Sequence, residues 1–417
     1  MFDSILLRRS FLTLTTHGLA RFMAIIVFII FAHLLSVEDY GYFIYGSSIA
    51  RLIAVIALFG CLPVFVKYWG KSNLGINKKI NSIYRALNWY KFTGLIFIVI
   101  CIIGFYFYTQ FKYDSSTNIA FISFLIVIPL FIINIYQQFF NSIKKSVHSG
   151  LMQTFFYFIW IAFISLSYFS NLVDIQWILI GSIFTLTLYI SILMFYHLYK
   201  FGVKYEKPKY INKNFIFGQW AACFFIYIDI ILIEIFLSPQ DIAFYGVVVQ
   251  IVGVLSFVLG GVNMSIISEL SEYYHNKSLK VTQQRISYYV NFMTVIAIII
   301  TIFLLFFGRQ ILGLYGSEYE SQFILLAILI LAQLVNVLSG SNGWLIDISG
   351  NEKISLRAFV LAILIKIFFG IILIKFFGIL GMAFGTLLAV SFWNFYLVNF
   401  CINKIKLNPS IFMRKKF

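Results

Sequence analysis

Twelve long apolar runs constrain this chain more than any other feature of its sequence. Each run holds about twenty mostly apolar residues, the length that an α-helix needs to cross the hydrocarbon core of a bilayer. The runs lie at residues 11–35, 41–66, 92–110, 119–140, 150–169, 176–198, 215–237, 242–266, 288–307, 322–345, 358–376 and 379–401. In a chain of 417 residues, a composition of 61% hydrophobic and 11% charged residues is typical of a membrane protein rather than a soluble one. The sequence therefore predicts an all-α polytopic membrane protein with twelve transmembrane helices.

The basic residues gather in alternate connections between these runs. Most of the 31 Lys and Arg residues fall in segments 1–10, 67–91, 141–149, 199–214, 267–287, 346–357 and 402–417. The positive-inside rule then predicts that both termini are cytoplasmic and that the number of spans is even. We assign the net charge of +16 to this topology and to anionic lipid, not to a nucleic-acid partner.

One turn occurs twice, and its two copies divide the chain. Ser36-Val37-Glu38-Asp39-Tyr40-Gly41 recurs 202 residues later as Ser238-Pro239-Gln240-Asp241-Ile242-Ala243. An S-x-x-D pattern before an apolar run is typical of a helix N-cap. Asn134 and Asn336 repeat at the same offset. The repeat predicts two parallel six-helix lobes, residues 1–202 and 203–417, the second ending in a basic cytoplasmic tail.

Five formal charges lie inside the predicted spans: Arg21, Arg51, Asp229, Glu234 and Lys366. A charge in hydrocarbon is costly, so it normally faces a partner or a polar cavity. The functional interpretation is a pathway whose cations bind phosphate or carboxylate groups, and whose acids couple transport to an ion gradient. The structural alternative is an ion pair such as Arg21–Asp229, with Glu234 reaching the headgroups from near the end of its span.

Further polar residues could extend the pathway formed by Arg21, Arg51 and Lys366. His17 shares a helix face with Arg21, and the fourth and tenth spans carry Asn134, Gln138, Gln333 and Asn336. These side chains could bind sugar hydroxyls, or they could join helices by hydrogen bonds. We expect no cofactor and no metal, because the sequence has no phosphate-binding loop and its histidines show no metal spacing.

Four stretches resemble the polysaccharide flippases, which export O-antigen and capsule repeat units within the multidrug/oligosaccharidyl-lipid/polysaccharide superfamily. They are the two S-x-x-D turns, Ile311-Leu312-Gly313-Leu314-Tyr315-Gly316-Ser317-Glu318-Tyr319 in the outer loop, and Leu345-Ile346-Asp347-Ile348-Ser349-Gly350-Asn351. The resemblance implies a MATE-like fold in a bacterial plasma (inner) membrane. It implies alternating-access flipping of an undecaprenyl-diphosphate-linked oligosaccharide for lipopolysaccharide or capsule synthesis. Membrane lipid, polysaccharide polymerase and chain-length proteins are the partners it suggests.

Three alternatives remain open from the sequence. A multidrug or organic-cation exporter of the same superfamily would have the same architecture, with acids rather than arginines in its cavity. A polysaccharide polymerase, ligase or glycosyltransferase would need a larger outer loop than residues 308–321, so we expect the chain not to be an enzyme. A peptidoglycan-precursor flippase resembles this pattern but usually has fourteen spans.

Overall fold

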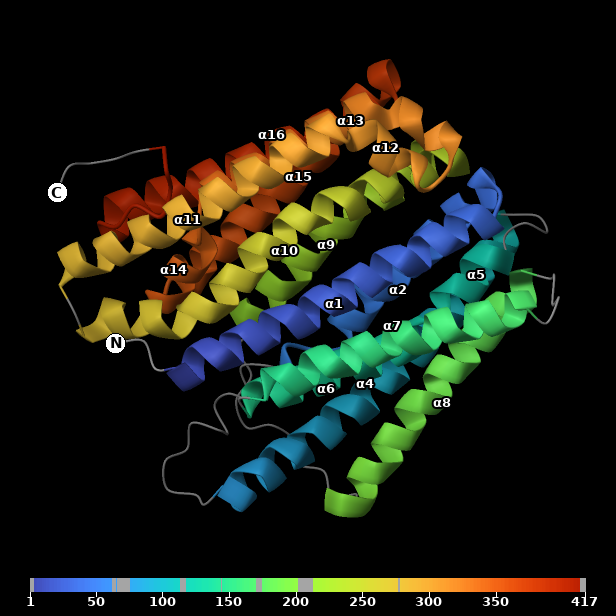
Figure 1. The fold of residues 1–417 in the computed structure, drawn as a ribbon, viewed down its shortest axis with the longest axis horizontal. Coiled ribbons are helices and arrows are strands. Elements are labelled where there is room, and N and C mark those ends of the chain that lie inside the picture. Colours follow the sequence, from blue (N-terminus) through green and yellow to red (C-terminus); the bar gives the residue numbers. More distant parts are fainter. Residues whose placement is uncertain are drawn as a thin grey trace. The chain divides into compact units, whose positions relative to one another are not determined.

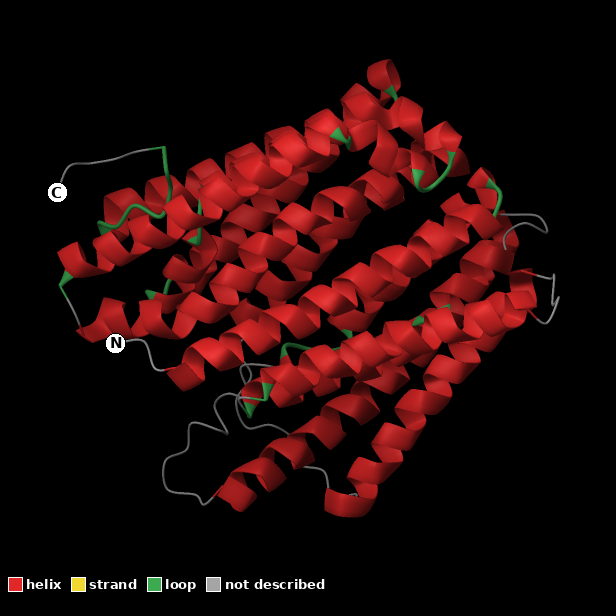
Figure 2. Cartoon of the chain, viewed as in Figure 1, coloured by secondary structure: helices red, strands yellow, loops and turns green. Residues whose placement is uncertain are grey.

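The computed structural model describes residues 4–61, 65, 76–112, 118–143, 145–169, 175–201, 213–276 and 278–412. Every regular element in these ranges is a helix, as Figure 2 shows. The chain forms two compact units, Met1–Trp220 and Ala221–Phe417, which we call lobe 1 and lobe 2 and describe separately. The sequence placed the division after residue 202, and that boundary stays a prediction.

Lobe 1 is built mainly from long helices (Figure 1). Its helices are α1 (Ser4–Leu34), α2 (Val37–Ile56), α4 (Ile76–Lys112), α5 (Asn118–Phe124), α6 (Val127–Ser142), α7 (Ser146–Phe169) and α8 (Ile175–Phe201), and α9 (Lys213–Phe236) begins in it. Helix α1 packs on α7, and α2 packs on α5 and α6. Aromatic side chains fill the interior, with Phe31, Phe43 and Trp160 almost fully buried. Phe31 contacts both of the other two rings.

Lobe 2 continues from α9 and has the same long-helix construction. Its elements are α10 (Pro239–Asn276), α11 (Leu279–Phe306), α12 (Gly308–Gly313), the 3₁₀ helix η2 (Ser317–Gln322), α13 (Phe323–Leu338), α14 (Asn342–Ile348), α15 (Glu352–Phe377), α16 (Ile379–Phe400) and the π-helix η3 (Cys401–Ile405). Helices α15 and α16 lie side by side (Figure 1). Gly378 joins them at a φ of 55°, a conformation that glycine adopts without steric cost.

The predicted all-α polytopic fold is confirmed. All twelve predicted spans contain helix, and eleven segments of the described residues are long and apolar enough to cross a membrane. Helix α2 is not among those eleven, because its 20 residues include Glu38, Asp39 and Arg51. Two spans are broken. The break between α5 and α6 precedes Pro129, which has no N–H to donate, and the break after α13 falls at Gly340, whose φ is 66°.

The two copies of the S-x-x-D turn share two hydrogen bonds between the Ser hydroxyl and the Asp. The Ser36 hydroxyl donates to Asp39 Oδ2 at 2.8 Å and accepts from the Asp39 backbone N–H at 3.1 Å. The Ser238 hydroxyl donates to Asp241 Oδ2 at 2.6 Å and accepts from the Asp241 N–H at 3.3 Å. Both turns are therefore helix caps, as the sequence predicts, and in the second the Ser238 N–H also donates to Asp241 Oδ2 at 3.1 Å.

The C-terminal segment 406–412 lies along lobe 2 and is held by a reciprocal pair of hydrogen bonds. Gln283 Nε2 donates to the Asn408 carbonyl at 2.9 Å, and Gln283 Oε1 accepts from the Asn408 N–H at 2.7 Å. The Ile411 N–H donates to the Leu338 carbonyl at 3.1 Å. A Cβ on Gly340 would overlap the Pro409 carbonyl oxygen, so the segment and α13 approach too closely for a side chain there.

Replacing Gln283 with Leu should release this segment without unfolding the lobe. The substitution removes both bonds to the Asn408 backbone, a loss of about 1–3 kcal/mol of local stability. Hydrogen exchange should then be faster at the amides of Asn408 and Ile411 by a factor of about ten or more. Gln284→Leu is the matched control, because Gln284 is the exposed neighbour on the same helix. Equal exchange in the two variants would contradict the clamp.

Candidate functional site

A buried ion pair lies inside lobe 2. Lys366 Nζ on α15 is 2.6 Å from Asp229 Oδ1 on α9, and both side chains are almost completely buried. Lys366 Nζ also donates to the Phe225 carbonyl at 2.8 Å and lies 4.2 Å from the centre of the Phe225 ring. Charge, carbonyl and ring thus surround the ammonium on the α9 side.

Two hydroxyl groups complete the surroundings of Asp229. The Tyr245 hydroxyl on α10 donates to Asp229 Oδ2 at 2.6 Å, and the Thr386 hydroxyl on α16 donates to the same oxygen at 3.1 Å. The two hydroxyls are 3.2 Å apart. One carboxylate therefore joins α9, α10, α15 and α16. We call Asp229, Tyr245, Lys366 and Thr386 the ionic network.

Small residues allow the helices around this network to pack closely. Ala362 and Gly370 lie on the same buried face of α15 as Lys366. Ala362 belongs to an apolar cluster with Phe225, Ala389 and Val390. A buried ion pair requires good geometry and further hydrogen bonds to offset desolvation. In the network, Asp229 Oδ1 contacts the Lys366 ammonium and Oδ2 accepts two hydrogen bonds, and the opposite charges of the pair cancel.

Lobe 1 has no such network at the equivalent positions. At an offset of 202 residues, the counterparts of Asp229, Tyr245 and Lys366 are Val27, Phe43 and Ile164. All three apolar side chains are buried in the core of lobe 1. At these three pairs of positions, lobe 2 has the ion pair and a hydroxyl, and lobe 1 has apolar side chains.

The basic residues predicted in lobe 1 have a different environment from Lys366. Arg51 on α2 is half-buried, and its Cζ lies 4.9 Å from the centre of the Phe28 ring on α1. Arg21 on α1 is exposed. Neither guanidinium forms a salt bridge with a carboxylate among the described residues of the chain. A cation–π contact leaves the N–H groups of Arg51 available for an anion.

His17 lies where α1 packs against α7. Two bonds flank it: Thr13 Oγ1 and Ser146 Oγ are 2.8 Å apart, and Thr154 donates to the Thr16 carbonyl at 3.0 Å. The His17 Nε2 is buried and has no hydrogen-bond partner within the described residues. His17 and Arg21 share helix α1, but the packing of α7 covers only the imidazole.

The amide side chains divide in the same way between the lobes. In lobe 1, Asn134 and Gln138 are partly buried on α6. In lobe 2, Asn336 accepts from Asn394 Nδ2 at 3.2 Å, and Asn342 donates to Asn394 Oδ1 at 2.9 Å. These hydrogen bonds join α13, α14 and α16. Asn336 therefore has the helix-joining role that was the alternative to sugar binding. Gln333 lies one turn earlier on α13 and is partly buried, and Glu234 on α9 is partly buried with a partner of its own.

Four polar residues of the ionic network and of the asparagine hydrogen bonds were not predicted from the sequence: Tyr245, Thr386, Asn342 and Asn394. Tyr245 lies two residues beyond the repeated turn. Thr386 and the two asparagines have no distinguishing local pattern. The signal available was the pair Asp229 and Lys366, two opposite charges on different spans that each needed a partner. Among the described residues, no group of three His, Cys, Asp or Glu could hold a metal ion.

The fold defines a polytopic helical membrane protein, with an ionic network buried in lobe 2. No protein-family model matches the chain, and no curated protein matches its sequence. Solved structures do match. The MATE multidrug transporter DinF-BH is 13% identical, with 97% of this chain and 96% of that chain covered and a TM-score of 0.71.

Two further structures extend the comparison to another transporter. The lipid II flippase MurJ in an inward closed conformation is 16% identical, covers 93% of this chain and 87% of its own, and has a TM-score of 0.70. An inward-facing MATE family transporter of the MOP superfamily is 12% identical, with 92% of each chain covered and a TM-score of 0.67. The chain therefore has the MATE transporter fold.

Proposed function

We propose that this chain is a flippase that moves a lipid-linked oligosaccharide with a diphosphate group across a bacterial plasma membrane by alternating access. The observation that carries the proposal is the pair of lobe 1 arginines, Arg21 and Arg51, which lack a carboxylate partner among the described residues. A guanidinium binds phosphate oxygens in a bidentate manner and stays charged at every physiological pH. The likeness to a lipid II flippase supports the same cargo class.

In this proposal the ionic network of lobe 2 couples transport to an ion gradient. Asp229 and Lys366 exchange charge with an incoming ion only if their own contact opens, since each neutralises the other at rest. Protonation of Asp229, or binding of a metal cation to its carboxylate, would release the ammonium. Lys366 is thus assigned to ion coupling, together with Asp229. Glu234 remains a second candidate for coupling.

The amides are the proposed contacts for the sugar part of the cargo. Asn134, Gln138 and Gln333 are partly buried and carry both donors and acceptors, which suits hydroxyl groups. Asn336 is already bonded to Asn394, so its remaining capacity is its Nδ2 group. His17 supplies an imidazole on the same helix as Arg21.

Flipping of a fluorescent polyprenyl-diphosphate oligosaccharide in liposomes tests the arginines. Arg51→Ala should lower the initial rate about tenfold or more, because a charge-assisted bond is worth about 1.5–3 kcal/mol. Arg51→Lys should recover part of the rate, and Arg21→Ala combined with Arg51→Ala should abolish flipping.

Arg309→Ala is the matched control. Arg309 also lies over a ring, 5.7 Å from the centre of Phe323, but it stands on α12 outside the predicted pathway. An equal effect of Arg309→Ala and Arg51→Ala would assign both to stability and contradict the anion site. Full activity of the Arg21/Arg51 double variant would contradict the flippase mechanism.

A multidrug exporter is the second candidate, favoured by the match to the multidrug transporter DinF-BH. The same liposomes distinguish it. Uptake or release of a rhodamine dye along an ion gradient, with no flipping of the oligosaccharide lipid, would identify the chain as an exporter of organic cations. Because Asp229 is paired with Lys366, we expect weak binding of such a dye at this carboxylate.

A further inference from the structure

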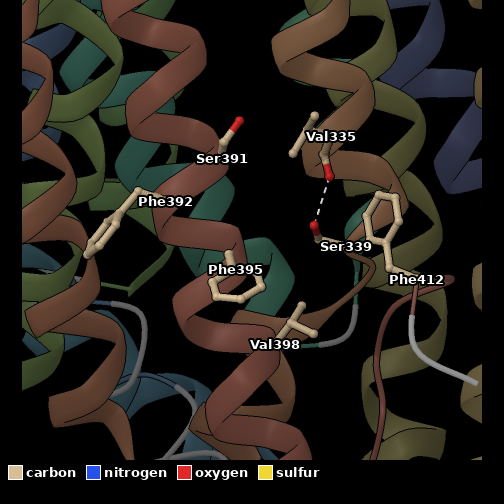
Figure 3. A pocket seen from close by; sticks show the side chains of 7 residues that line it. All are labelled: Val335, Ser339, Ser391, Phe392, Phe395, Val398 and Phe412. Carbon is tan, nitrogen blue, oxygen red and sulfur yellow. Dashed lines mark hydrogen bonds between the residues drawn. The ribbon is translucent and has the colours of Figure 1, made fainter. Parts of the chain in front are cut away.

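A cavity of about 500 Å³ opens on lobe 2 between α13, α16 and the C-terminal segment. Figure 3 shows Val335 on α13, Ser339 at its C-terminal end and Phe412 beside Ser339, with four side chains of α16 opposite: Ser391, Phe392, Phe395 and Val398. Its volume lies within the range of roughly 300–1,000 Å³ typical of small-molecule sites. The cavity uses no residue of the ionic network.

The walls of the cavity suit hydrocarbon. Val335, Phe392, Phe395, Val398 and Phe412 supply the apolar surface. Ser339 donates its hydroxyl to the Val335 carbonyl at 2.8 Å, so it makes no demand on a ligand. The cavity therefore lacks the convergent polar groups that a sugar or a drug cation would require.

The cavity is also open at the surface of the transmembrane helices. Phe395 is 63% exposed and Phe412 is 57% exposed, although both border the same hollow. In a protein that spans a bilayer, such an opening on α13 and α16 faces a hydrocarbon solvent. A chain of a membrane lipid can therefore enter from the side.

Basic residues near the cavity favour a lipid with an anionic headgroup. Lys404 and Lys406 are exposed in the stretch that links α16 to Phe412. Residues 401–412 contain no acid. Basic residues close to a membrane surface attract anionic lipids by about 1 kcal/mol each. The Gln283–Asn408 clamp keeps this basic stretch next to the cavity.

We propose that this cavity binds one acyl chain of an anionic phospholipid, whose phosphate is held by Lys404 and Lys406. The occupant is a bilayer lipid rather than the cargo, because a cavity of this size accepts a single chain of ordinary length and not a long polyprenyl chain. The proposal does not depend on what the protein transports. It gives the C-terminal segment a role as one wall of a lipid site.

Photoaffinity labelling tests the site in the full chain. The protein is placed in phosphatidylcholine nanodiscs that contain a small amount of phosphatidylglycerol with a diazirine in one acyl chain. After irradiation, labelled residues are mapped by mass spectrometry. We expect label concentrated on residues 391–398 and around Phe412, at several times the level found on the exposed face of α8.

Two variants distinguish binding of the lipid's acyl chain from binding of its headgroup. Ser391→Trp fills the cavity and should lower labelling there about tenfold, whereas Ser191→Trp on an exposed face of α8 should not. Replacing Lys404 and Lys406 with Gln should lower labelling by phosphatidylglycerol severalfold, whereas Lys375→Gln at the far end of α15 should have no effect.

Three results would overturn the proposal. They are labelling no greater than on α8, labelling that Ser391→Trp does not change, and equal labelling by a phosphatidylcholine probe. Displacement of the probe by a polyprenyl diphosphate, but not by unlabelled phosphatidylglycerol, would also overturn it, because the occupant would then be the cargo. Circular dichroism and size-exclusion profiles identical to those of the parent protein establish that each variant is folded.

Discussion

Lys366→Met is expected to destabilise lobe 2 by about 3–5 kcal/mol, because it leaves the Asp229 carboxylate buried without its cation. Asp229→Asn should be destabilising for the converse reason, since it strands a buried ammonium. The double variant Asp229→Asn/Lys366→Met removes both charges and keeps an acceptor for Tyr245. Its stability should therefore return to within about 1 kcal/mol of the parent, or exceed it. Chemical unfolding in mixed micelles measures the four states of this cycle.

The double variant also separates folding from transport. If the ionic network couples transport to an ion gradient, the double variant should fold normally and lose gradient-driven movement of cargo in liposomes. Lys375→Met is the control for the loss of a lysine, because Lys375 lies exposed on the same helix. Single variants as stable as Lys375→Met would show that the pair is unimportant for stability. Full gradient-driven transport by the double variant would remove the network from coupling.

Gly46→Val is expected to have the second-largest effect, by separating α2 from α5. A Cβ at Gly46 would overlap the backbone carbonyl oxygen of Ala120, and backbone cannot move aside as a flexible side chain can. Overpacking of this kind costs about 1–3 kcal/mol or more. The same substitution should disturb Arg51, which lies on the same helix, and so should lower flipping as well as thermal stability.

Gly104→Ala is the matched control for that substitution. Gly104 lies within α4, and a Cβ there would meet no atom within 4 Å. Alanine in a helix interior is more favourable than glycine by roughly 0.5–1 kcal/mol, so this variant should be slightly more stable than the parent. A Gly46 variant that unfolds at the same temperature as Gly104→Ala would contradict the close packing of α2 and α5.

The sequence was sufficient for the fold because hydrophobic length and helix caps are local properties. All twelve apolar runs contain helix, and Ser36 and Ser238 cap their helices through the hydrogen bonds that S-x-x-D predicts. The breaks at Pro129 and Gly340 change the number of helical pieces but not the number of spans. A local pattern thus predicts a membrane span well even when the span consists of two helices.

The ionic network could be predicted only in part, because its geometry depends on residues distant in sequence. Because Asp229 and Lys366 lie inside predicted spans, the sequence indicated that each needs a partner. Nothing local indicated that they would meet each other, since Lys366 is 137 residues from Asp229 along the chain. Thr386 was not predicted because a threonine hydroxyl in an apolar helix often bonds to its own backbone. Tyr245 was not predicted because nothing in the local sequence marks its hydroxyl as a partner of Asp229. The basic residue Lys91 was assigned to a loop, but it is buried in α4 beside Tyr136.

The difference between the lobes has an electrical consequence. A membrane potential acts on net charge, at about 2.3 kcal/mol per elementary charge moved across 100 mV. The Asp229–Lys366 pair is neutral and carries no net charge when it moves as a unit. Arg51 and Arg21 lack a described counter-ion, so any displacement of lobe 1 along the field moves charge. Voltage should therefore drive conformational change through the arginines of lobe 1, and an anionic cargo bound there would cancel that sensitivity.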